Sequence, residues 1–121
     1  PESVLTHSAA DLNIDHAIAL RATLNATRPK FDSNVKFVGS FEIPSSTNLG
    51  FGSQTNFKPG LFVDVTDFLS VKNVALKQYP REIPISLHPR SLQALERNVK
   101  SWGDFCEVQA SEAFEVQRIL I

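Results

Sequence analysis

The sequence has little cysteine and no long apolar run, and each shortage excludes a class of protein. Its single cysteine, Cys106, cannot form a disulfide within the chain, which fits a reducing cytoplasm and excludes a zinc site built from cysteines. No apolar stretch approaches the roughly 20 residues of a membrane-spanning helix, and no charged-then-apolar signal segment opens the chain. We therefore expect a cytoplasmic protein without a membrane anchor.

An excess of charge of either sign is also lacking. The 12 Lys and Arg residues nearly balance the 13 Asp and Glu residues, for a formal net charge of −1, and no basic cluster appears. The sequence therefore gives no indication of a basic surface that would bind nucleic acid or an anionic membrane. Internal repeats, a phosphate-binding glycine loop and an interdomain linker are absent from the sequence. At 121 residues, we expect a single domain over residues 1–121 with a modest core.

Methionine is missing altogether, and the chain begins at Pro1. These two features favour a fragment of a longer protein. A chain from which the initiator methionine had been removed would look the same, so both interpretations stay open.

Hydrophobic periodicity predicts alternating strands and helices. Strands are expected at residues 2–6, 35–43, 61–65 and 111–121, with the first and third buried. Helices are expected at residues 14–27 and 89–103, and a further helix, capped by Thr66 or Asp67, extends to Tyr79. Pro89 suits a first helical turn, and Gly103 suits a helix end. Alternating elements of this kind predict an α/β fold with a mostly parallel sheet of about four or five strands flanked by three helices.

One stretch concentrates the groups that could do chemistry. Residues 4–16 form an apolar strand, a polar loop and a helix entry, and they contain His7, Asp11 and His16. The crevice where a strand ends and a helix begins is a common ligand site in α/β folds. On the predicted helix, His16 lies nearly opposite the polar stripe that starts at Arg21, so we expect a half-buried imidazole. A core histidine and a metal ligand are both compatible with that position.

The run Thr-His-Ser-Ala-Ala-Asp-Leu-Asn-Ile-Asp-His, residues 6–16, resembles the second metal motif of the LmbE-like, or PIG-L, zinc-dependent N-deacetylases. These enzymes remove acetyl groups from N-acetylglucosamine-type sugars. The resemblance implies that His16 is a zinc ligand and that Asn13 faces the reacting acetyl group. It also implies that Asp15 holds and orients the loop.

Further motifs of that family follow in order along the chain. They are Glu-Ile-Pro-Ser-Ser-Thr at residues 42–47, the strand and helix of residues 57–79, His-Pro-Arg-Ser at residues 88–91, and Glu-Ala-Phe at residues 112–114. The resemblance implies the C-terminal half of a Rossmann-like deacetylase, with His88 and Arg90 contacting the sugar. The long polar segment of residues 45–59 is expected to be a functional loop.

The His-Pro-Asp-Asp-Glu motif, which supplies two zinc ligands and the catalytic aspartate in this family, is absent. Three interpretations follow. The chain is the C-terminal half of a deacetylase completed by an N-terminal half, or a sugar-binding remnant without catalysis, or a structural module that forms homo-oligomers. A substitute metal site made of His7, Asp11 and His16 is a further possibility.

Overall fold

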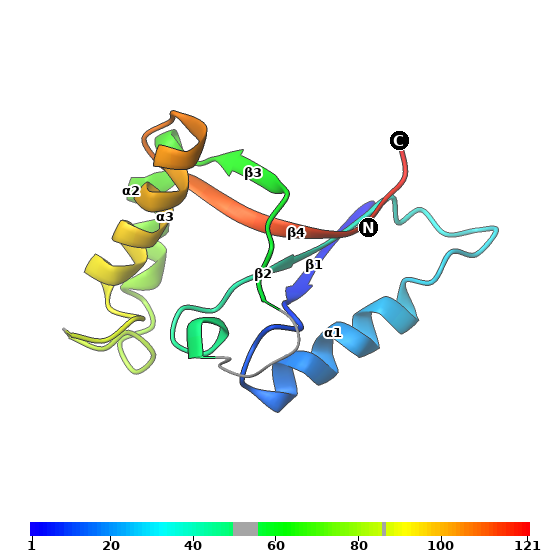
Figure 1. Ribbon diagram of the computed structural model, residues 1–121, viewed down its shortest axis with the longest axis horizontal. Helices are drawn as coiled ribbons and strands as arrows, with labels where there is room; N and C mark the ends of the chain where they lie inside the picture. Colours follow the sequence, from blue (N-terminus) through cyan, green and yellow to red (C-terminus); the bar gives the residue numbers. More distant parts are fainter. Residues whose placement is uncertain (50–55, 86) are drawn as a thin grey trace. The chain divides into compact units, whose positions relative to one another are not determined.

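The computed structural model describes residues 1–49, 56–85 and 87–121. Figure 1 shows an α/β chain, as the sequence predicts, whose four-stranded sheet is accompanied by helices. The elements are β1 (Ser3–His7), α1 (Ile14–Ala26), β2 (Phe37–Phe41), η1 (Thr47–Leu49), β3 (Leu61–Asp64), η2 (Thr66–Phe68), α2 (Leu69–Leu76), α3 (Leu92–Cys106) and β4 (Ser111–Ile119).

The chain forms two compact units, which are described separately below. The first unit contains Pro1–Leu61 and Phe114–Ile121, and the second contains Phe62–Ala113. The first therefore holds β1, α1, β2 and most of β4, and the second holds α2, α3 and nearly all of β3.

The sheet is mixed, with strand order β1-β2-β4-β3. Strands β1 and β2 are parallel, whereas β2 and β4 are antiparallel with an irregularity between Val38 and Gly39. Strand β3 also runs antiparallel to β4, because Gly60 donates to the Phe114 carbonyl and Val65 donates to the Ala110 carbonyl. The prediction of a mostly parallel sheet is therefore wrong. Apolar patterning marks strands but carries no information on the direction of their neighbours.

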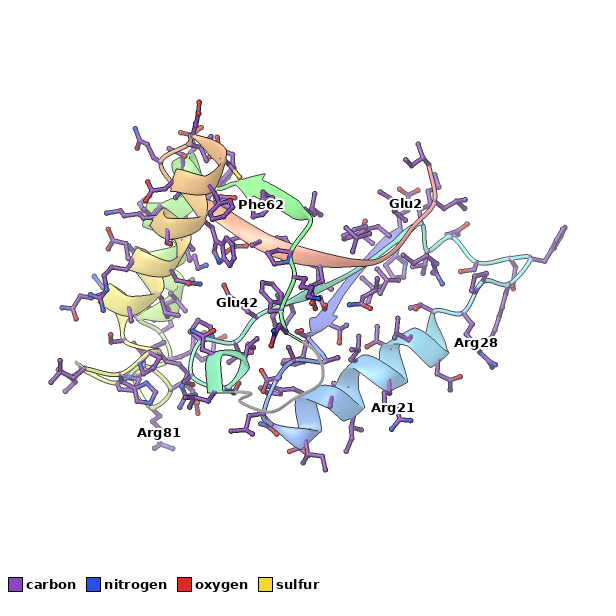
Figure 2. All side chains as sticks on the ribbon, viewed as in Figure 1. Glu2, Arg21, Arg28, Glu42, Phe62 and Arg81 are labelled. Atoms are coloured by element: carbon purple, nitrogen blue, oxygen red, sulfur yellow. The ribbon has the colours of Figure 1, made fainter. Side chains whose placement is uncertain are left out.

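In the first unit, α1 packs beside β1 through the face that the sequence predicts. Leu20 is buried on this helix, and the hydroxyl of Thr23 donates to that of Thr6 on β1 at 3.3 Å. Figure 2 shows Arg21 projecting from the opposite side of α1, and Asn25 on that stripe is also exposed. The predicted helix and its solvent-facing stripe are confirmed.

The prediction that the first and third strands are buried is wrong. Leu5 on β1 is 50 % exposed and Val63 on β3 is 42 % exposed. Strand β1 lies at the edge of the sheet, and in the first unit α1 packs beside it on the Thr6 side. Apolar residues on the other side of such a strand keep contact with solvent although their sequence resembles that of a buried strand.

In the second unit, α3 begins and ends later than the sequence predicts. The hydroxyl of Ser91 accepts the Ala94 N–H and caps the helix, so Pro89 lies outside the first turn. At the other end the helix continues past Gly103, which is buried, to a left-handed residue at Glu107. A Cβ at Gly103 would lie 2.6 Å from the Val108 carbonyl oxygen. The glycine therefore permits the chain to fold back against the helix rather than ending it.

The helices are short compared with a lipid bilayer. The longest in the described part of the chain, α3, has 15 residues and is amphipathic, with buried Val99 on one side. No helix in the described residues is long and apolar enough to span a membrane.

Candidate functional site at the entrance to α1

Two histidine rings stack near the loop that connects β1 to α1 in the first unit. His7 is the last residue of β1 and His16 lies in the first turn of α1. Their ring centroids are 4.0 Å apart and the ring planes differ by 14°. The ring of Phe41, opposite His7 on β2, lies 5.0 Å from His7. The predicted half-buried position of His16 is confirmed, with 21 % of its side chain exposed.

The carboxylate of Asp11 is the polar centre of this site. Its side chain is fully buried, and Oδ1 accepts the Asn13 backbone N–H at 2.8 Å. Oδ2 accepts the hydroxyls of Ser46 at 2.7 Å and Thr47 at 3.0 Å. Oδ1 also lies 3.0 Å from Nδ1 of His16, although the ring N–H direction is not well aligned with this oxygen. Asp11 thus connects the entrance of α1 to the segment around η1.

These contacts change the acid–base properties of the site. Burial alone raises the pKa of Asp11, but hydrogen bonds from the Asn13 N–H, Ser46 and Thr47, together with the neighbouring His16 ring, outweigh burial and bring the pKa below its usual value. Burial and the neighbouring His16 ring lower the pKa of His7, and the Asp11 charge opposes this shift only in part. As a result, the Asp11 carboxylate and the His7 ring both resist protonation.

Asn13 has two contacts at the same place. Its Oδ1 accepts the Asp15 backbone N–H at 2.9 Å, which makes Asn13 the N-cap of α1. Its Nδ2 lies 3.4 Å from Nε2 of His16. Asp15 is exposed in the first turn of the helix. The three predicted residues Asn13, Asp15 and His16 therefore lie together around one helix entrance.

The two other predicted site residues, His88 and Arg90, belong to the second unit. Nδ1 of His88 accepts the Arg90 backbone N–H at 3.0 Å, within the turn that leads to α3. The guanidinium of Arg90 lies 3.6 Å from the Glu82 carboxylate. Both residues are half-buried, and their local contacts hold the turn. Their predicted sugar contact stays a prediction.

The predicted functional loop of residues 45–59 is described in part, because residues 50–55 lie outside the described residues. Its first part contains the Ser46 and Thr47 hydroxyls that bind Asp11. Its last part includes Lys58, whose backbone N–H donates to Glu115 at 2.9 Å.

The residues of this site do not by themselves fit a zinc ion. Across residues 1–49, 56–85 and 87–121, no group of three His, Cys, Asp or Glu side chains is arranged to hold a metal. The stacked rings of His7 and His16 explain this, because a ring nitrogen binds a metal along its own plane and nearly parallel rings cannot converge on one ion. The substitute site of His7, Asp11 and His16 is therefore not formed.

Sequence reasoning missed a second carboxylate, Glu115 on β4. Its Oε2 accepts the hydroxyls of Ser8 at 2.7 Å and Ser40 at 2.8 Å, and both serines are completely buried. These contacts join β2, β4 and the residue that follows β1 within the first unit. The small polar residues at the end of β1 and within β2 were the available signal, but they did not indicate which carboxylate would contact them.

Comparison with known proteins adds information on the fold. No protein-family model matches the chain, and no curated protein matches it. Among solved structures, the chain is similar to the conserved protein TT1542 from Thermus thermophilus, with a TM-score of 0.75 and 18 % sequence identity. The similarity covers 100 % of this chain and 54 % of the other protein. The chain thus has the fold of about half of that longer protein.

Proposed function

We propose that this chain is the C-terminal part of a zinc-dependent N-deacetylase acting on N-acetylglucosamine-type sugars. Sequence resemblance to the LmbE-like, or PIG-L, deacetylases gives the substrate class and assigns His16 as one zinc ligand. The observation that carries the proposal is the half-buried His16 ring beside the fully buried Asp11 carboxylate at a strand-to-helix junction. A carboxylate next to a histidine is the usual partner of a metal-binding imidazole in proteins.

In this proposal the other zinc ligands come from another segment or polypeptide. A catalytic zinc requires three protein ligands, and the described residues contain no group of three side chains arranged to hold one. The chain's match to 54 % of a longer protein of the same fold supports an arrangement in which a second half is needed. The Rossmann-like topology of the complete enzyme belongs to the same proposal.

The remaining assignments follow from position. Asn13, whose amide points to His16, would face the reacting acetyl group, and the exposed Asp15 would orient the helix entrance. His88 and Arg90 would contact sugar hydroxyl groups, because both carry hydrogen-bond donors and Arg90 presents a planar fork of them.

The test begins with the native gene product, isolated from its source cells with an antibody against this chain. A mass of roughly twice 13.4 kDa is expected if a second half is attached. The isolated protein should contain zinc and release acetate from an N-acetylglucosamine derivative, and the His16→Ala variant should do neither. A protein of 13.4 kDa that binds no zinc, alone or with any co-purified partner, would refute the proposal.

One observation favours the structural alternative, a module that forms homo-oligomers. Leu5 on β1 is 50 % exposed and Ile119 on β4 is 57 % exposed, both within the first unit, and β1 is an edge strand. Exposed apolar side chains, together with an edge strand, favour association with another chain. A concentration-dependent dimer with neither zinc nor sugar bound would support this alternative, whereas a monomer at all concentrations would exclude it.

A further inference from the structure

We propose that Asp11 is a positioning residue that fixes the orientation and the tautomer of the His16 ring. In the favoured tautomer the proton is on Nδ1, beside the Asp11 carboxylate, and Nε2 keeps its lone pair. This inference rests on the proposed function in one respect: the proposed function explains why Nε2 would be kept unprotonated for a ligand. The geometry that supports it is independent of any metal.

The two nitrogens of His16 have neighbours of opposite character. Nδ1 lies 3.0 Å from Oδ1 of Asp11, which can only accept a proton contact when ionised, and although the N–H is not aligned with this oxygen, the negative charge favours a proton on the nearer nitrogen. Nε2 lies 3.4 Å from the amide nitrogen of Asn13, which can only donate. An acceptor beside Nδ1 and a donor beside Nε2 both favour the same neutral form, with the proton on Nδ1.

The orientation of the Asn13 amide is determined by a separate contact. Its oxygen accepts the Asp15 backbone N–H at 2.9 Å as part of the helix cap. The amide nitrogen must then be the atom that faces His16, because the two ends of the amide cannot exchange without loss of the cap. The donor beside Nε2 is therefore a consequence of helix capping.

Asp11 itself is held from three directions. The Asn13 N–H and the hydroxyls of Ser46 and Thr47 all donate to it, and its side chain has no exposed surface. The contacts leave the carboxylate little freedom to rotate, so its position next to His16 Nδ1 is fixed. On its ring face, His16 stacks on His7 at 4.0 Å, which restricts rotation of the imidazole as well.

A purely structural role explains these contacts less well. The helix α1 is already capped by Asn13, so Asp11 is not needed to satisfy the first helical N–H groups. An ionised carboxylate is costly to bury, and neutral groups could join the two segments at lower cost. The charge of Asp11 is explained if it stabilises one ring tautomer of His16, as carboxylates next to metal-binding histidines do.

The experiment measures the His16 tautomer by long-range ¹H–¹⁵N NMR of the chain at neutral pH with a chelator present. The three histidines are assigned by single His→Gln variants. We expect the Nδ1-protonated form for His16 in the unaltered chain. In Asp11→Ala the ratio of the two tautomers should shift toward the Nε2-protonated form by about threefold or more, because the negative charge 3.0 Å from Nδ1 is removed.

Two additional variants separate positioning from simple loss of structure. Asp11→Asn retains an oxygen that can face Nδ1, so it should restore part of the wild-type ratio. Asp64→Ala is the matched control, because Asp64 accepts a backbone N–H two residues ahead at 2.9 Å, as Asp11 does, but lies in the second unit. It should leave the His16 signals unchanged.

If Asp11→Ala does not fold, Ser46→Ala decides the matter, since it frees one side of the carboxylate and should produce a smaller shift in the same direction. An Nε2-protonated His16 in the unaltered chain would overturn the proposal, as would a ratio insensitive to both Asp11 variants and to Ser46→Ala. The test uses neither zinc nor sugar. Absence of deacetylation with an Asp11-dependent tautomer would therefore count against the proposed function alone.

Discussion

Two histidines stand at helix entrances in this protein, one in each unit, and their surroundings differ. His16 lies inside the first turn of α1, beyond the Asn13 cap, with a buried carboxylate beside Nδ1. His88 lies three residues before the Ser91 cap of α3, and its Nδ1 accepts a backbone N–H from Arg90. The first ring is held by side chains, whereas the second is part of a local turn.

The difference shows that a histidine next to a helix N-terminus is not a site by virtue of that position. Its availability depends on whether the cap residue lies before or after it. A ring inside the first turn can meet groups from other segments, as His16 meets Asp11 and His7. A ring before the cap tends to hydrogen-bond to the backbone of the turn, because unpaired backbone groups near a helix entrance compete for its nitrogens.

The largest expected effect comes from truncating each ring in the native gene product. Under the proposed function, His16→Ala should abolish measurable deacetylation, because a three-ligand catalytic zinc does not tolerate the loss of a ligand. His88→Ala should reduce kcat/KM less than about tenfold, the effect of one hydrogen bond. Steady-state release of acetate measures both. Equal losses of kcat/KM for the two variants would contradict the interpretation that the two histidines have different roles.

The carboxylates beside the two entrances should differ in their contribution to stability. Asp11→Ala leaves three hydrogen-bond donors without their acceptor, and we expect it to lower the free energy of unfolding by about 2–4 kcal/mol. Glu82→Ala removes a solvent-exposed partner of Arg90, and the loss should be at most about 0.5 kcal/mol. Urea unfolding followed by circular dichroism gives both values. A loss for Glu82→Ala as large as that for Asp11→Ala would contradict this interpretation.

The two helix caps offer a smaller contrast. Ser91 is 2 % exposed and Asn13 is exposed, so a lost cap bond at Ser91 cannot be replaced by water as easily. We expect Ser91→Ala to cost about 1–2 kcal/mol and Asn13→Ala about 0.5–1 kcal/mol, measured by the same unfolding experiment. The reverse order would indicate that the Asn13 amide contributes more through His16 than through the cap.

The smallest effect concerns pH. The folded pKa of His7 is lower than that of the unfolded chain, about 6.5, so the unfolded state binds more protons as the pH falls below this value. The stability contributed by the neutral ring is fully present above pH 6.5 and decreases as the pH approaches the folded pKa. His7→Gln should flatten this decrease between about pH 7.5 and 5.5 in unfolding experiments with a chelator. Parallel pH profiles of the two proteins would count against a lowered pKa.

Much of the local structure is predictable from the sequence. The extent of α1, its solvent-facing stripe and the half-buried position of His16 follow from residue spacing, and the four strands were expected near their observed positions. Strand direction and strand burial were predicted incorrectly. Both depend on which element covers which face, and a single strand's composition does not contain that information.

For the candidate site, the sequence by itself determined that His7, Asp11 and His16 lie near one strand-to-helix junction, because a short loop cannot separate them. The cap of α1 is a local feature as well, since capping depends on residues adjacent in the chain, and the structure assigns it to Asn13. Only the tertiary structure decided that the Asp11 carboxylate is buried under Ser46 and Thr47 and that Glu115 meets Ser8 and Ser40. These pairs are 35 to 107 residues apart in the chain, and contacts at that separation form only when sheet pairing and burial bring the segments together.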